Sequence, residues 1–136
     1  MIRELKIHTS GQGLREITHE VSSILEDAEI ETGLCTVFLK HTSASLIIQE
    51  NADPSAKRDL EAWMNRLVKE RDPLFTHTFE GPDDMPSHIK AALTASSLSI
   101  PVLGGMMCLG TWQGIYLWEH RTASHSRNVV VQVMGD

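Results

Sequence analysis

The sequence has few cysteines, no long hydrophobic run and no excess of basic residues, and each lack argues against a class of protein. Its two cysteines, Cys35 and Cys108, are far apart and form no CxxC or other closely spaced metal-ligand pattern. Both stand among apolar residues, which predicts buried structural thiols. The net charge of -6 opposes binding to a polyphosphate backbone, so nucleic acid is not an expected partner.

Targeting and membrane segments are also lacking. The N-terminal stretch MIRELKIHTSGQG mixes charges into its first residues and does not have the form of a secretory signal. The most apolar stretch, IPVLGGMMCLG, is broken by Pro101 and two glycines and is well short of a membrane span. We therefore expect a cytoplasmic protein without a membrane partner. With 136 residues, 41% of them hydrophobic, we expect one domain over residues 1–136.

Hydrophobic periodicity predicts short strands with a few inserted helices. Helices are expected from Thr18 as an N-cap, from Pro54 with Asp53 as its N-cap, and from Pro86. Because strands dominate and helices do not alternate with them one for one, we expect an α+β fold with antiparallel sheets. The strands are expected over 2–9, 34–40, 45–50, 75–79, 98–103, a stretch ending in GIYLWEHR, and 128–134.

The helix that follows Pro54 has the clearest pattern. Its apolar residues recur at i, i+3, i+4, i+7 and i+8, which is typical of a helix with one buried face. We expect this stripe to pack on the core. It consists of Leu60, Trp63, Met64, Leu67 and Val68.

Polar residues end two of the predicted strands. His41 continues the face of Cys35, Val37 and Leu39, so this face leads either to the edge of a cavity or to a histidine bonded to local backbone. In GIYLWEHR, the apolar face continues into Glu119 and Arg121. That pattern indicates either a packed face opening onto a polar site or a solvated ion pair at a sheet rim, worth well under ~1 kcal/mol.

The loop EGPDDMPSH places three carboxylates close to a histidine. Glu80, Asp83 and Asp84 precede His88, which lies near the N-terminus of a predicted helix. Carboxylates suit Mg²⁺, and mixtures of histidine and carboxylate suit Zn²⁺ or Mn²⁺. The alternative is that the acidic residues only complement the helix dipole.

Three stretches resemble the signatures of a known family. HTSASLIIQENADP, EGPDDMPSHIK and GTWQGIYLWEHR are similar to the motifs of the YjbQ family, named secondary thiamine-phosphate synthase, and the resemblance runs from the first strand to Gly135. It implies two packed, mostly antiparallel sheets with about three flanking helices, assembled as a homotrimer. It also implies one site made from His41, Ser43, Asn51, Asp84, His88, Trp112, Gln113, Glu119 and Arg121.

The reaction implied joins an aminopyrimidine diphosphate to a thiazole phosphate and releases pyrophosphate. Because two like unit charges 4 Å apart repel by roughly 4 kcal/mol near a protein surface, phosphate beside these carboxylates needs a divalent cation. The expected ligands are His41, Asp84, His88 and Glu119, with His41, His88 and Glu119 also expected to be catalytic. Substrate contacts are expected from Ser43, Asn51, Lys90, Trp112, Gln113 and Arg121.

Two other interpretations remain open. The same cluster could hold Zn²⁺ in a metal- or metabolite-binding trimer whose synthase activity is incidental, whereas Mg²⁺ is expected for the synthase. It could also serve a metal-assisted hydrolase. Trp112 and Gln113 follow Gly110 in a turn-like stretch, so they could be trimer contacts rather than ligand contacts. All three interpretations require the motifs to meet in space.

Overall fold

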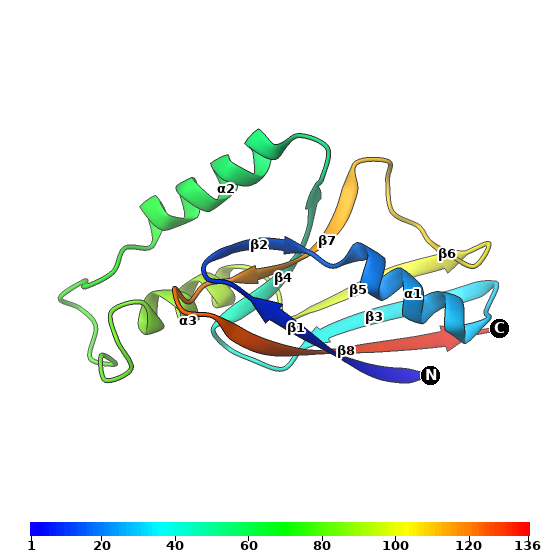
Figure 1. The fold of residues 1–136 in the computed structure, drawn as a ribbon, viewed down its shortest axis with the longest axis horizontal. Helices are drawn as coiled ribbons and strands as arrows, with labels where there is room; N and C mark the ends of the chain where they lie inside the picture. Colours follow the sequence, from blue (N-terminus) through cyan, green and yellow to red (C-terminus); the bar gives the residue numbers. More distant parts are fainter.

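The computed structural model describes residues 1–136 and confirms an α+β fold with two antiparallel sheets and three helices (Figure 1). The five-stranded sheet has the order β1 (Ile2–Thr9), β8 (His125–Gly135), β3 (Thr32–Leu39), β5 (Ser97–Leu103) and β6 (Met106–Met107). The three-stranded sheet has the order β2 (Gly13–Glu16), β7 (Gln113–Glu119) and β4 (Ala44–Glu50). The helices are α1 (Thr18–Ala28), α2 (Pro54–Leu67) and α3 (Asp84–Leu93).

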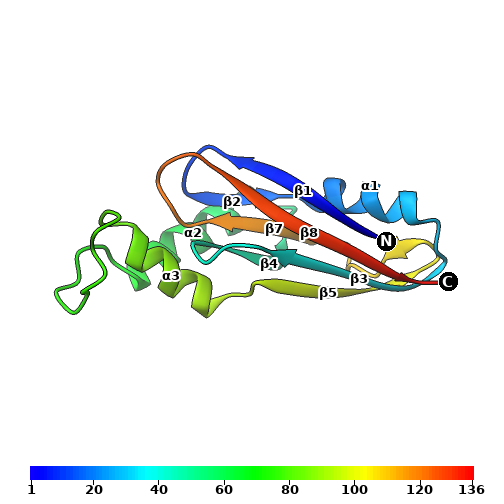
Figure 2. The same cartoon turned by 90° about the horizontal axis from the view of Figure 1, so that it is seen from below.

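The main core lies between the two sheets, with α1 packed at one end (Figure 2). Alternation in β3 sends Cys35, Val37 and Leu39 inward, where they stand in register with alternate valines of β8. On the opposing sheet, Ile115 and Leu117 of β7 are fully buried. The period-two pattern therefore predicted the buried face of each central strand correctly.

The other face of the three-stranded sheet is covered by α2 and α3. Tyr116 and Trp118 of β7 pack there with Met64 and Val68 from α2 and its C-terminal end. The molecule is thus layered as helices, small sheet and large sheet, while the outer face of the large sheet carries no helix. None of the helices combines the length and the apolar composition needed to cross a membrane.

The start of α2 follows its sequence signal. Asp53 is the N-cap and its side chain accepts a hydrogen bond from Ser55 N at 2.9 Å, with Pro54 in the first turn. The expected apolar stripe is only partly buried, because Trp63 and Leu67 are more than half exposed. The small sheet is too narrow to cover the whole stripe, since it has three strands.

Several local expectations are wrong. Ile17, not Thr18, is the N-cap of α1, because the Thr18 hydroxyl instead accepts from Ile115 N of β7. Residues 75–79 form no strand, since no neighbouring strand pairs with them. The third helix begins at Asp84 rather than Pro86. Cys108 is exposed, whereas Cys35 is buried as expected.

Candidate functional site

Three side chains with metal-binding atoms converge at the start of α3. The Nε2 atoms of His77 and His88 lie 2.8 and 3.0 Å from the same oxygen, Oδ2 of Asp84. One ligand atom from each residue falls within 4.8 Å of the others. Asp84 is buried, His88 is half-buried and His77 is exposed, so the group opens toward solvent on the His77 side. We call these three residues the His77 cluster.

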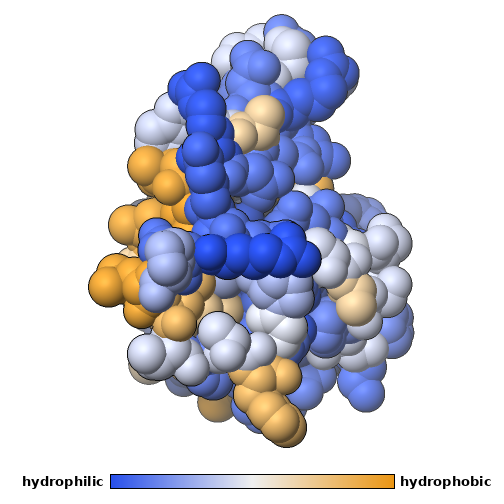
Figure 3. Space-filling view, turned by 90° about the vertical axis from the view of Figure 1, so that its left-hand side faces the viewer, coloured by the Kyte–Doolittle hydropathy of each residue, from blue (hydrophilic) through white to orange (hydrophobic).

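Local structure explains how the cluster forms. Asp84 and His88 are four residues apart on α3 and therefore lie on one face of the helix. The loop between α2 and α3 returns along the helix and brings His77 to them. The end of the molecule that carries this loop is mainly hydrophilic (Figure 3). A polar ligand could therefore approach the cluster from solvent.

The His88 ring is oriented by a second contact. Its Nδ1 lies 2.8 Å from the backbone oxygen of Thr42, so Nδ1 carries a proton and donates it. Nε2 is then the nitrogen that faces the Asp84 carboxylate, and either a second proton or a cation has to lie between the two. Metal-binding histidines are usually held by such a hydrogen bond from the other ring nitrogen to a carbonyl.

The acidic loop is held in place by Arg121. Its Nη1 donates to Asp84 Oδ1 at 2.9 Å and its Nε to Asp83 Oδ2 at 3.0 Å, while Nη2 reaches the Glu80 carbonyl. Burial alone would raise the pKa of Asp84, but hydrogen bonding from His77 and the charges of His88 and Arg121 bring it below its ordinary value. Asp84 is therefore ionised and keeps Oδ2 directed at the two imidazoles.

The donor set fits a divalent metal. Two imidazoles and one carboxylate form a three-ligand set typical of catalytic Zn²⁺ sites, which keep further positions open for water or substrate. The same set with open positions suits Fe²⁺, whereas Mg²⁺ prefers oxygen ligands throughout. The metal expected at Asp84 and His88 would therefore have a third candidate ligand, His77, which the sequence analysis did not identify.

Glu119 does not belong to the cluster. Its two carboxylate oxygens accept from Arg127 Nε at 2.8 Å and Nη2 at 2.6 Å, and Oε1 also accepts from the Thr9 hydroxyl at 2.7 Å. Burial raises the pKa of Glu119, but these hydrogen bonds outweigh it and the pKa is lowered. The structure therefore gives Glu119 a buried partner other than Arg121, which rules out the solvated Glu119–Arg121 pair.

His41 lies beside the cluster without joining it. β3 ends at Leu39, so His41 no longer follows the inward face and is exposed. Its Nδ1 lies 3.0 Å from both the backbone nitrogen and the hydroxyl of Ser43. Burial and the charge of Arg127 lower the pKa of His41, which favours a neutral ring. His41 and His88 line the same pocket of about 220 Å³.

Ser43 connects His41 to the buried ion pair. Its hydroxyl accepts from Arg127 Nη2 at 2.9 Å and is fully buried. Arg127 was missed, although one signal was available: it continues the inward phase of Val129, Val131 and Val133 in β8, where a charged residue requires a buried partner.

Asn51, Trp112 and Gln113 gather at the opposite end of the small sheet. Asn51 N donates to the Trp112 carbonyl, and the Gln113 side chain accepts from Gly110 N. β4 and β7 pair from Ala44–Glu119 to Glu50–Gln113, six residue steps or about 20 Å at the usual rise of a strand. Within one chain, the third motif is therefore split between two ends of the molecule.

Lys90 also points away from the cluster. It is buried, and its Nζ donates to Asn65 Oδ1 of α2 at 2.6 Å. The structure thus brings Asp84, His88 and Arg121 together and places His41 and Ser43 nearby. It does not bring Lys90, Glu119 or the Asn51 end to the same place.

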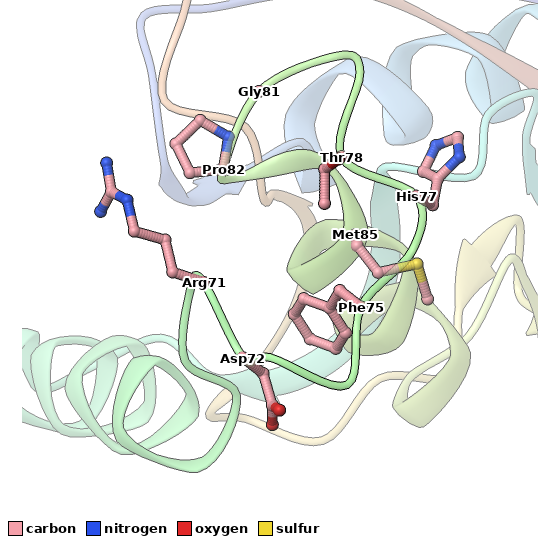
Figure 4. A pocket seen from close by; sticks show the side chains of 8 residues that line it. All are labelled: Arg71, Asp72, Phe75, His77, Thr78, Gly81, Pro82 and Met85. Carbon is pink, nitrogen blue, oxygen red and sulfur yellow. The ribbon is translucent and has the colours of Figure 1, made fainter.

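A second pocket adjoins the cluster on the His77 side. It has a volume of about 260 Å³ and lies inside the loop between α2 and α3 (Figure 4). Phe75 and Met85 supply apolar surface and Arg71 a positive charge at its rim. The cluster therefore lies between two pockets, since His77 lines this one and His88 lines the one shared with His41.

Comparison with known proteins shows which family the chain resembles. The family model described as UPF0047 protein YjbQ-like matches residues 3–136. The UPF0047 protein of Synechocystis sp. is 48% identical over 132 residues, 97% of this chain and 90% of that protein. YjbQ of Escherichia coli O157:H7 is 38% identical over 135 residues, 98% of this chain and 97% of that protein.

Solved structures agree with the sequence matches. A crystal structure of an uncharacterised YjbQ/UPF0047 protein from Clostridium acetobutylicum has a TM-score of 0.89 at 32% identity and covers 97% of this chain and 99% of its own. A hypothetical protein from Aeropyrum pernix has a TM-score of 0.91 at 25% identity, covering 100% and 99%. Because the family model matches residues 3–136 and relatives agree in sequence and in structure over nearly the whole chain, the chain belongs to the YjbQ (UPF0047) family.

Proposed function

We propose that the protein is a metal-dependent enzyme that acts on a small phosphorylated molecule. The observation that carries this proposal is the convergence of His77 and His88 on one buried carboxylate oxygen of Asp84. Arg121 pairs with the other oxygen, Oδ1, so Oδ2 and the two imidazole nitrogens are left facing one another as a set of ligand atoms that a cation could bridge. The open side of the cluster and its two flanking pockets leave room for a substrate.

A divalent metal held by these three residues would neutralise phosphate charge and polarise a phosphate oxygen. Neighbouring residues hold these ligands in position. Arg121 keeps Asp84 ionised and fixes its orientation, and Thr42 O fixes the His88 ring. Arg71 forms no ion pair within the chain and stands at the pocket rim, so its guanidinium is available to a phosphate group.

The reaction we assign is that of a secondary thiamine-phosphate synthase. The bond between the aminopyrimidine methylene carbon and the diphosphate oxygen breaks, and a bond to the thiazole nitrogen forms. The pocket inside the loop has aromatic and apolar surface from Phe75 and Met85, which suits a heteroaromatic ring beside a charged group. The chain's contribution is to position the reactants and to neutralise charge.

A coupling assay tests this assignment. The two phosphorylated substrates are incubated with the protein and either Mg²⁺ or Zn²⁺, and thiamine phosphate is measured. His77→Ala and Asp84→Asn should each abolish most turnover, while His19→Ala, an exposed histidine far from the site in α1, should keep it. Wild-type turnover in a folded His77→Ala/His88→Ala variant would show that this cluster is not the active site.

The donor set also favours a second function, a metal-assisted hydrolase of phosphate esters. Two imidazoles with one carboxylate are typical of hydrolytic Zn²⁺ sites. Substrate screening with simple phosphate monoesters and diesters separates the two functions. Hydrolysis that depends on Zn²⁺ and on His88, without any coupling activity, would favour the hydrolase.

We further propose that the protein acts in the cytoplasm as a homotrimer assembled through the outer face of the five-stranded sheet. Cross-strand neighbours on that face include Pro101, Leu34 and Met134, and Phe38 stands beside Val130 two rows further along. Leu34, Phe38 and Met134 are between 41% and 60% exposed, although all three are large and apolar. An apolar face of this kind is typical of an interface.

A further inference from the structure

A small polar pocket lies between the helices and the helix-covered face of the small sheet. It has a volume of about 130 Å³ and is separate from the His77 cluster. Lys90 follows His88 by two residues on α3, so the two side chains leave the helix in nearly opposite directions. The lining residues are Gln12, Gly13, Glu61, Asn65, Lys90, Trp118 and His120.

The first unusual group in this pocket is His120. The residue is 1% exposed, and its Nε2 lies 2.9 Å from the hydroxyl of Ser45. Nδ1 is fully buried and has no hydrogen-bond partner. The Ser45 hydroxyl has no other partner, and in the tautomer in which it donates to Nε2 the neutral ring carries its proton on Nδ1. In that tautomer the pocket contains a buried N–H donor without an acceptor, which costs free energy unless a ligand or water supplies one.

The second group is Lys90. The residue is 3% exposed, and its ammonium donates only to the side-chain oxygen Oδ1 of Asn65. No carboxylate lies within ion-pair distance of Nζ, so the buried ammonium makes no direct ion pair. Buried charges are normally paired. Lys90 and His120 thus present two kinds of donor to one cavity and require an anionic acceptor.

The third group is Glu61 of α2. Its carboxylate forms neither a hydrogen bond nor an ion pair within the chain. It lies against Gly13, where a Cβ atom would be only 2.8 Å from Oε2, so Gly13 leaves the space that the carboxylate occupies. Glu61 is only partly buried, and its carboxylate offers the pocket a negative charge and a hydrogen-bond acceptor, whereas Lys90 and His120 offer donors. The unpaired groups that line this pocket therefore carry charges of both signs.

We propose that this pocket binds a small zwitterion, with an oxyanion directed at Lys90 and His120 and an amino group directed at Glu61. The volume far exceeds the roughly 15 Å³ that one water needs, so a molecule of several heavy atoms fits. A molecule with only a negative charge would meet Glu61, and one with only a positive charge would meet Lys90. The simplest probe of this class is glycine.

Calorimetric titration of the full chain with glycine, acetate and methylammonium tests the proposal. Chelator is present throughout, because glycine also binds free metal ions. Glycine should bind with one site per chain and more tightly than either singly charged probe. Glu61→Gln should weaken glycine binding by about tenfold, the usual effect of losing a charge-assisted hydrogen bond, and should strengthen acetate binding.

Matched controls separate the pocket from surface charge and from the cluster. Asp59→Asn, the control for Glu61→Gln, removes a negative charge from an exposed position of α2 and should leave glycine binding unchanged. Lys69→Met, the control for Lys90→Met, removes an exposed positive charge and should also leave glycine binding unchanged. His88→Ala should also keep glycine binding. Equal binding of glycine and acetate, no difference between Glu61→Gln and Asp59→Asn, or loss of binding in His88→Ala would overturn the proposal. The Glu61 comparison decides the question even if Lys90→Met does not fold.

Discussion

Glu119 and Arg127 form a two-point ion pair that is closed to solvent and joins the two sheets. Glu119 belongs to β7 of the small sheet and Arg127 to β8 of the large one. Their side chains are 1% and 2% exposed, and the Nη2–Oε2 distance is 2.6 Å. The Thr9 hydroxyl from β1 binds the same carboxylate. The pair is thus a polar connection inside an otherwise apolar core.

Breaking this pair should destabilise the protein strongly. Arg127→Met leaves the Glu119 carboxylate buried without a cation, and loss of one partner from a buried pair typically costs about 3–5 kcal/mol. Urea unfolding measures the change in free energy. Glu4→Gln, which breaks the exposed Lys40–Glu4 pair, is the control and should cost less than about 1 kcal/mol. The double variant Arg127→Met/Glu119→Gln should recover part of the loss.

The His77 cluster should bind Zn²⁺ with an affinity that depends on all three ligands. Removal of one imidazole in His77→Ala or His88→Ala should weaken binding by more than the roughly 10–100-fold seen when only an outer partner of a ligand is lost. Calorimetry with zinc, at constant pH, measures this. His41→Ala should bind zinc like the unaltered protein, since His41 lines the pocket without contacting Asp84. Equal affinity in all three variants would contradict the assignment.

The free energy of unfolding should decrease as the pH is lowered, because of His120. Burial, reinforced by the charge of Lys90, lowers the pKa of His120 from 6.5 to about 3. The unfolded state therefore binds a proton between about pH 6.5 and pH 3 that the folded state does not. The contribution of His120 is complete above pH 6.5 and is lost as pH falls toward 3, at up to about 1.4 kcal/mol per pH unit.

Urea unfolding at several pH values from 4 to 7 checks this dependence. His120→Gln should flatten the pH dependence relative to the unaltered protein, because the glutamine amide does not titrate. The exposed His19→Gln is the matched control and should leave the slope unchanged. An identical slope in His120→Gln would mean that carboxylates alone cause the loss of stability in acid.

A charge on the outer face of the large sheet should dissociate the proposed homotrimer. Phe38→Lys places an ammonium beside Val130 on this face, where burial at an interface would be costly. Sedimentation equilibrium measures the mass, which should be close to three times 15.2 kDa for the unaltered chain and 15.2 kDa for Phe38→Lys. Trp63→Lys changes another exposed aromatic residue, on α2 and away from this sheet face, and this variant should stay trimeric.

The sequence predicted most of the fold because its elements depend on local patterns. Period-two alternation found the buried face of β3, and Asp53-Pro54 marked the start of α2. The expected strand over 75–79 was wrong because alternation also occurs in a loop, and pairing with a neighbour is a long-range property. For the same reason His77 was missed, since its role depends on where that loop returns.

The sequence predicted which residues lie close together where two of them share one helix face, and was incomplete elsewhere. Asp84 and His88 are i and i+4, so their proximity follows from helix geometry. Glu119 and Arg121 share a strand face only in an ideal strand. β7 ends at Glu119, and beyond that residue Arg121 turns to Asp83 and Asp84. The family resemblance implied one site, but within one chain these residues lie at two opposite ends of the small sheet.

The backbone between β3 and β4 is bound from two sides, by the His88 ring at the Thr42 carbonyl and by Arg127 at the Ser43 hydroxyl. This is also where the chain passes from the large sheet to the small one. An ion at the cluster would immobilise the imidazole that holds this crossover. We therefore expect metal to slow hydrogen–deuterium exchange around residues 41–43. The exchange rate of this segment between the sheets would then show whether the His77 cluster holds a metal ion.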